Sequence, residues 1–183
     1  MGKINKGFTL VETLVIIAII GLSLPAVFAI FFSIIQQQVR IYRLTEVKRQ
    51  GDYSLSIIQN LIRNNAQKIY RTNSPTDFEI CSTTTNTAEA VSYFTDKSNN
   101  RFSFSIPAGS SNIASVSASF QVPLTNDKVR ISNFEITCNR SSTYSTPYVN
   151  LSYEICYSNS DGSACTNEPP SFFYSTKLKL KNY

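Results

Sequence analysis

Hydrophobic residues follow three different patterns along the chain. Residues 8–35 form the first, a run of 28 residues that is apolar except for scattered Thr and Ser and one Glu. A helix needs about 20 apolar residues to cross the hydrocarbon core of a bilayer. The first pattern therefore predicts a membrane-spanning helix over residues 8–35.

The second pattern begins after three consecutive glutamines at positions 36–38. Apolar side chains now recur at intervals of three, four and seven, which mark one face of a helix. The members of this stripe are Leu44, Val47, Leu55, Ile58, Ile62 and Ile69. We expect a single helix from Phe8 to about Arg71, amphipathic over residues 36–71. It should end before Pro75, because the residue preceding a proline disfavours helix.

Two residues disturb the helical pattern without ending it. Pro25 lies in the apolar half, where it removes one backbone hydrogen bond and predicts a bend. Gly51 lies in the amphipathic half and costs about 1 kcal/mol relative to Ala, but the period continues through it.

The third pattern is an alternation of apolar and polar residues after Pro75, which predicts short strands. The expected strands lie within residues 102–106, 118–122, 128–138, 149–157 and 172–180. Within residues 128–138 the alternation changes phase, which predicts a β-bulge near Ser132 and Asn133. Such strands are typical of an antiparallel sheet with one solvated face. The fold class is therefore α+β, with a long N-terminal helix packed on an antiparallel β-sheet head of residues 72–183.

Charge is concentrated in the helical half of the chain. Nine of the 17 Lys and Arg residues lie within residues 1–71, against three acidic residues. This asymmetry indicates a membrane surface or a polyanion near the helix. The chain has no His, so the usual general base is missing, and it has no Gly-rich phosphate loop. We expect neither an enzyme nor a bound cofactor.

All four cysteines lie in the predicted head, at Cys81, Cys138, Cys156 and Cys165. They form no Cys-x-x-Cys pair, and no His is present to complete a zinc site. An even number of cysteines after an export segment indicates two disulfides, formed outside the cytoplasm. We expect Cys156–Cys165 as the local pair and Cys81–Cys138 as the other. The alternative is four buried free thiols, since sequence does not fix pairing.

Near its N terminus the chain reads Gly7-Phe8-Thr9-Leu10-Val11-Glu12 and continues apolar to Gly21. This string resembles the N terminus of type IV pilins and of the pseudopilins of type II secretion. In that family a short basic leader ends in Gly, Phe follows, and Glu is the fifth residue after the cut. The resemblance implies that residues 1–7 are a leader, cut between Gly7 and Phe8 by a prepilin peptidase. It also implies N-methylation of the new Phe8 amine.

Glu12 is the candidate assembly residue. An ionised carboxylate inside a membrane helix costs about 2.5–3.5 kcal/mol on insertion scales, so it normally has a partner. An α-amino group is cationic at neutral pH. In a filament of parallel helices, Glu12 of one subunit can therefore neutralise the Phe8 amine of its neighbour. The alternative is that Glu12 lies at the membrane interface and extends into water.

The resemblance implies a structural subunit, a minor pilin or a pseudopilin, in a type IV pilus-like or type II secretion filament. The implied partners are the prepilin peptidase, other pilin-like subunits, an assembly platform and the lipid bilayer. The implied location is a single pass through the inner (cytoplasmic) membrane with the head outside the cytoplasm, followed by the pilus or pseudopilus. Pro25 would then be a weak point where the helix extends on leaving the bilayer.

Three observations keep other interpretations open. A conventional signal peptide could be cut after Ala29, although the apolar run continues past that position. Arg40 and Arg43 follow the apolar run and favour the opposite membrane orientation. The chain could also be a single-pass, membrane-anchored binding module whose head, outside the cytoplasm, holds a ligand, for example DNA in a competence pilus. Its contacts would be Lys177, Lys179 and Lys181 on one strand face, which otherwise form an ordinary solvated edge.

Overall fold

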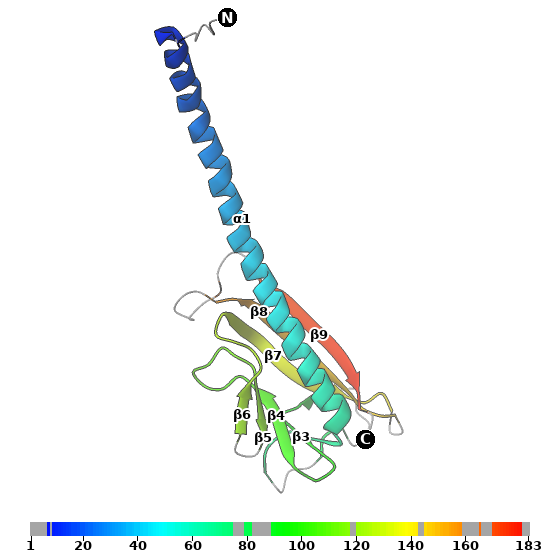
Figure 1. The fold of residues 1–183 in the computed structure, drawn as a ribbon. Coiled ribbons are helices and arrows are strands. Elements are labelled where there is room, and N and C mark those ends of the chain that lie inside the picture. The colour runs from blue at the N-terminus through cyan, green and yellow to red at the C-terminus, as the bar shows by residue number, and fades with distance from the viewer. Residues whose placement is uncertain are drawn as a thin grey trace, which may run out of the picture. The chain divides into compact units, whose positions relative to one another are not determined.

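The computed structural model describes residues 7, 9–74, 79–81, 89–117, 120–142, 145–158, 165 and 170–180. The chain divides into two compact units, Met1–Tyr42 and Arg43–Tyr183. Helix α1 (Leu10–Asn65) contributes its first part to one unit and its last part to the other. All described strands belong to the second unit (Figure 1).

The strands form two antiparallel sheets. The five-stranded sheet has the order β1 (Lys68–Tyr70), β3 (Tyr93–Thr95), β4 (Arg101–Ser105), β5 (Ala114–Ser117) and β6 (Phe120–Pro123). The four-stranded sheet has the order β2 (Glu89–Ala90), β7 (Val129–Asn139), β8 (Tyr148–Tyr157) and β9 (Phe172–Lys179). The α+β class, with a long helix packed on antiparallel sheet, is confirmed. The division into two sheets differs from the single sheet that the sequence predicts.

Helix α1 ends at Asn65, so the prediction of a helix to about Arg71 is wrong. The backbone N–H of Gln67 donates to the Thr95 carbonyl at 2.8 Å, and Lys68–Tyr70 pair with β3. Ile69 is fully buried in its strand, as it would have been on the helical stripe. The apolar spacing therefore continues past the end of the helix, but after Asn65 the backbone forms sheet hydrogen bonds and not helical ones. The predicted stop at Pro75 lies outside the described residues.

The last part of α1 packs on the four-stranded sheet. Its side chains Val47, Ile58 and Ile62 are fully buried, as are Leu151 and Ile155 of β8. The Gln59 side-chain amide donates to Thr176 Oγ1 of β9 at 2.9 Å. Figure 1 shows β7, β8 and β9 lying beside this part of the helix. The apolar face of the amphipathic part of α1 thus packs on the sheet and shields it from solvent, as the sequence predicts.

Two strands test the predicted alternation most sharply. In β7 the register shifts between Ser132 and Glu135, and Asn133 has a φ of 51°, which confirms the bulge. In β6, Phe120 is 78% exposed and Val122 is 57% exposed. This strand is the last of its sheet, so its apolar side chains extend beyond the core.

Candidate processing and assembly site

The first turn of α1 is capped by Thr9. The backbone N–H of Glu12 contacts both Thr9 Oγ1, at 3.3 Å, and the Thr9 carbonyl oxygen, at 3.1 Å. Thr9 is therefore the N-cap residue, and Glu12 is the third residue of the helix. Thr-x-x-Glu is the spacing of a capping box. A carboxylate in the first turn also interacts favourably with the positive end of the helix dipole.

The capping role of Thr9 is a feature that sequence reasoning missed. The available signal was the Thr-x-x-Glu spacing directly before an apolar run. It gives Glu12 a role within its own chain in addition to the predicted role between chains.

The structure describes only one side of the predicted cleavage bond. Gly7 is exposed, and a Cβ atom added to it would meet no atom within 4 Å. An accessible glycine suits the close approach of a peptidase. Phe8 lies outside the described residues, so cleavage at Gly7–Phe8 and methylation of Phe8 stay predictions.

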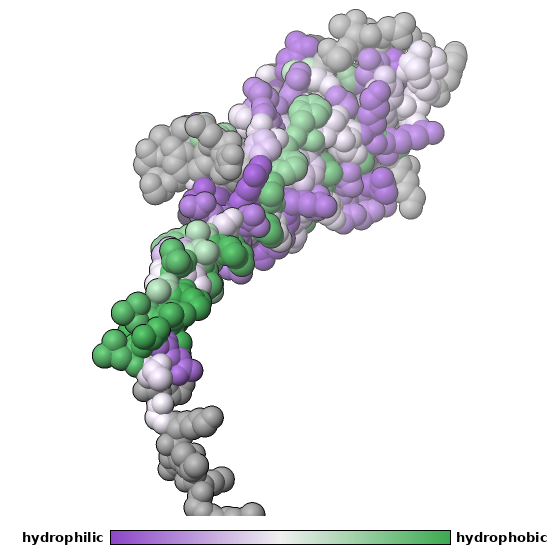
Figure 2. Space-filling model, turned by 90° about the horizontal axis from the view of Figure 1, so that it is seen from above, coloured by the Kyte–Doolittle hydropathy of each residue, from purple (hydrophilic) through white to green (hydrophobic). Residues whose placement is uncertain are grey.

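The first unit presents an uncovered apolar surface. Every residue from position 9 to position 42 is exposed, and Figure 2 shows hydrophobic side chains covering this part of the helix. By length and composition alone, α1 is the one helix of the described chain that could span a membrane. Apolar area gains about 25 cal/mol per Å² when it leaves water. A surface of this kind therefore requires lipid or other apolar helices around it.

Polar side chains within this apolar stretch bond to their own helix. Thr13 Oγ1 donates to the Leu10 carbonyl at 2.8 Å, and Ser23 Oγ donates to the Ile20 carbonyl at 3.2 Å. Between residues 8 and 39, Glu12 is the one charged side chain. The helix runs without interruption through Pro25, and the predicted bend there stays a prediction.

In the second unit, Glu46 joins α1 to the loop that follows β6. Glu46 is 6% exposed and accepts hydrogen bonds from Arg49 Nη2 at 2.7 Å and from Asn126 Nδ2 at 2.7 Å. Gln50 Nε2 donates to the same carboxylate at 3.1 Å. Burial by itself raises the pKa of Glu46, but the hydrogen bonds from Asn126, Gln50 and Arg49 outweigh it and lower the pKa.

Two tyrosines join α1 to β8 and β9. Tyr153 Oη donates to the Gly51 carbonyl at 2.8 Å and lies 3.0 Å from Ser54 Oγ. Tyr174 Oη donates to Asp52 Oδ1 at 3.1 Å, and the two tyrosine rings stack at 5.4 Å. Burial raises the pKa of Tyr153 to about 12, so its hydroxyl remains a donor at neutral pH.

Gly51 has a packing role that the helical period did not reveal. A Cβ atom at this position would lie 2.5 Å from the ring of Tyr174. Real Cβ atoms do not approach so closely, so the ring of Tyr174 occupies space that only a glycine leaves open.

The structure contains the disulfides Cys81–Cys138 and Cys156–Cys165, the pairs that we expected from the sequence. Cys81 and Cys138 are buried, whereas Cys165 is exposed. The first bridge links the described segment before β2 to β7, and the second closes a short loop after β8.

Lys177 and Lys179 of the predicted basic face are both exposed on β9. The Lys177 ammonium lies 5.8 Å from the centre of the Tyr148 ring, a cation–π distance. Lys181 lies outside the described residues, so the structure shows two of the three predicted cations.

Comparison with known protein families finds a match at the N terminus. The model of the prokaryotic N-terminal methylation motif matches residues 2–24, and this motif is the prepilin signature of type IV pilins. No curated protein and no solved structure matches the chain. The resemblance of the N terminus to prepilins is confirmed, and proteins with this motif are structural subunits. The match includes Gly7, Phe8, Glu12 and the apolar start of α1.

Proposed function

We propose that this chain is a structural subunit, a minor pilin or pseudopilin, of a type IV pilus-like or type II secretion filament. One observation carries the proposal. The methylation motif at residues 2–24 continues directly into a helix whose side chains are exposed and apolar through the first unit. A prepilin needs both features, since the motif directs processing and the apolar helix is what packs in a filament.

In this proposal the chain is first held in the membrane by its apolar helix, with the head outside the cytoplasm. A prepilin peptidase removes residues 1–7 and methylates the Phe8 amine. An assembly platform then transfers the subunit from lipid into a filament, where the helices of other pilin-like subunits replace the bilayer. The side chains of residues 9–42, which are exposed in the isolated chain, would be covered by lipid in the membrane and by neighbouring helices in the filament.

Glu12 supplies the selectivity of assembly. Within one chain Glu12 lies in the first turn of α1, where a carboxylate interacts favourably with the positive end of the helix dipole. In the filament core it would pair with the Phe8 amine of the neighbouring subunit and fix the axial register. A desolvated charge that loses its partner costs about 3–5 kcal/mol, so only the register that pairs these groups is stable.

Replacing Glu12 with Gln tests this proposal. Gln serves at the third position of a capping box as Glu does, so Glu12→Gln keeps the start of the helix and removes only the charge. We expect normal insertion and cleavage, but a fall in filament incorporation by orders of magnitude. Ser23→Ala is the matched control, since Ser23 bonds only within its own helix among the described residues. Equal incorporation of Glu12→Gln and the unmodified chain would exclude Glu12 from assembly.

A further inference from the structure

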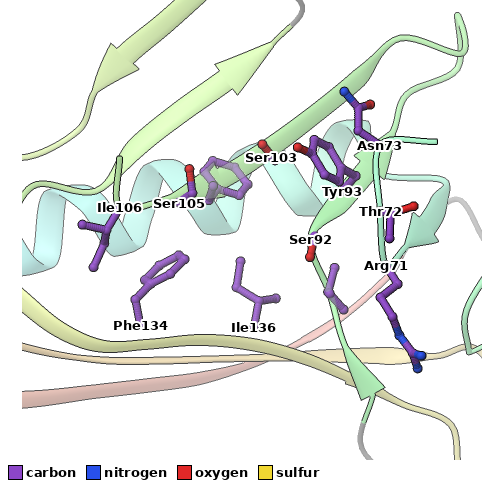
Figure 3. Close-up of a pocket in the computed structure, with 12 residues that line it drawn as sticks. Arg71, Thr72, Asn73, Ser92, Tyr93, Ser103, Ser105, Ile106, Phe134 and Ile136 are labelled. Atoms are coloured by element: carbon purple, nitrogen blue, oxygen red, sulfur yellow. The ribbon is translucent and has the colours of Figure 1, made fainter. Parts of the chain in front are cut away.

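A cavity lies in the second unit between β4 of one sheet and β7 of the other. Its volume is about 700 Å³. The two strands belong to different sheets, so no ladder of hydrogen bonds closes the space between them. Figure 3 shows Phe134 and Ile136 on the β7 side and Ser103 and Ser105 on the β4 side.

The cavity is apolar at one end and polar at the other. Phe134, Ile106 and Ile136 form the apolar end, and Asn73 and Arg71 lie at the polar end (Figure 3). Ligand sites in proteins combine an apolar floor with a few polar groups that orient the ligand. Size and lining therefore fit a small organic ligand that has both an apolar face and several polar groups.

A second hollow of about 330 Å³ shares two walls with this cavity, Asn73 and Tyr93. It adds the side chains of Asn99, Asn100 and Arg101. Asn73 and Tyr93 line both hollows, so the two lie side by side.

The lining of the two hollows favours an anion. Among the described residues that line them there is no Asp or Glu, while an arginine lines each hollow, Arg71 or Arg101. The carboxylate of Asp96, beside the second hollow, already accepts hydrogen bonds from Asn100 Nδ2 at 3.1 Å and from the backbone N–H groups of Ser98 and Asn100 at 2.8 Å. The Arg101 guanidinium lies 4.9 Å from the centre of the Tyr70 ring, and its Nη1 donates to the Ser74 carbonyl at 3.0 Å. A guanidinium has five N–H donors. Arg101 Nη1 also lies 3.4 Å from Asn73 Oδ1, so these contacts hold the guanidinium at the hollow that it lines. Guanidinium groups bind carboxylates through paired N–H donors.

We propose that the two hollows form a binding site for an acidic saccharide, a short chain of carboxylated sugars. The hydroxyl groups of Ser103 and Ser105 and the amides of Asn73, Asn99 and Asn100 both donate and accept, as sugar hydroxyls do. The apolar end of the cavity takes the C–H face of a sugar ring. Arg101 binds the carboxylate. This site goes beyond filament assembly and does not depend on it.

Two other classes of anion fit this surface less well. Single-stranded nucleic acid is bound by a groove of many cations that follows the phosphates. Here two arginines and no lysine line the hollows. An extended peptide is usually bound by adding a strand to a free sheet edge. Strand β4 pairs with β5 along Phe102–Ser105 but with β3 only at Arg101 and Phe102, so Ser103–Ser105 offer at most a three-residue edge.

The test uses the full chain in detergent micelles and isothermal titration calorimetry. The probes are tetrasaccharides of galacturonate, of mannuronate and of hyaluronan, with a neutral galactose tetrasaccharide for comparison. We expect at least one acidic probe to bind at least tenfold more tightly than the neutral one. Two variants address the site: Asn73→Asp places a negative charge where the hollows meet, and Ser105→Trp fills the cavity from an exposed position. Each should weaken that binding at least tenfold.

Asn60→Asp is the matched control, because Asn60 is exposed on α1 and lines neither hollow. It should bind as the unmodified chain does, and all variants should keep the same thermal unfolding midpoint within a few degrees. Binding of none of the three acidic probes would overturn the proposal. So would unchanged affinity in both site variants, or a preference for a single-stranded oligonucleotide or a poly-glutamate peptide over every sugar.

Discussion

The hydroxyl group of Tyr153 donates a hydrogen bond to the carbonyl oxygen of Gly51 at 2.8 Å, across 102 residues of sequence. The ring of Tyr174 stacks on Tyr153 and fills the space beside the Gly51 Cα. Helix α1 is therefore joined to the four-stranded sheet at the point where it lacks a side chain. The glycine weakens the isolated helix but leaves the space that the Tyr174 ring occupies.

Gly51→Ala should destabilise the head by about 1–3 kcal/mol, the usual cost of overpacking a well-filled core. The gain of about 1 kcal/mol in helix propensity offsets only part of this cost. Urea unfolding followed by circular dichroism would measure the difference. Gly21→Ala is the control, because a Cβ atom there meets nothing within 4 Å. A Gly51→Ala chain as stable as the unmodified one would show that the Tyr174 ring moves aside freely.

Glu46→Gln should lower the free energy of unfolding by about 1–3 kcal/mol at neutral pH, since charge-assisted hydrogen bonds from Arg49 and Asn126 are weakened. The pKa of Glu46 is lowered in the folded state. The stability that the ionised Glu46 carboxylate contributes is therefore fully present above the pKa of Glu in the unfolded chain, about 4.3. It is lost as the pH falls below that value. The stability difference between the two chains should shrink in acid. Glu135→Gln, at an exposed position on β7, is the control. A difference that grows below pH 4 would contradict this account.

The two disulfides should differ in their accessibility to a reductant and in their contribution to the stability of the head. The Cys156–Cys165 bridge has an exposed partner and spans 9 residues, whereas Cys81–Cys138 is buried and spans 57. A mild reductant should open Cys156–Cys165 first. Loop-closure entropy makes the longer bridge the stronger one by about 1.5 kcal/mol. Alkylation with peptide mapping gives the order, and paired Cys→Ser variants give the stabilities. Earlier reduction of Cys81–Cys138, or four free thiols after export, would refute this assignment.

The N-terminal half of the molecule was the more predictable part. Its apolar run exceeds the thickness of a bilayer, and the Gly7-Phe8 junction with Glu12 is a local signal that requires no tertiary contact. The bulge at Asn133 could also be predicted, because a change of phase in the apolar–polar alternation of a strand is a local sequence signal. The N-cap role of Thr9 was equally local and could have been predicted from its spacing to Glu12.

Several features that depend on distant segments could not be predicted. Ile69 has the spacing of a helical stripe, but pairing of Lys68–Tyr70 with Tyr93–Thr95 makes it part of a strand. The alternation around Phe120 does not reveal that β6 lies at the edge of its sheet. The cavity between β4 and β7 was likewise not predictable, since folding alone brings Asn73 and Tyr93 into the same lining as Phe134.

Mass spectrometry of the N terminus, on protein sheared from assembled filaments, tests the central claim most directly. A subunit processed as a prepilin should begin at Phe8 and carry a methyl group on its amine, with residues 1–7 absent. Membrane-bound protein from the same cells should contain both the uncut and the cut form. A mature terminus at Ile30, an intact Met1 in filaments, or a chain found in the membrane but never in filaments would contradict the assignment as a filament subunit.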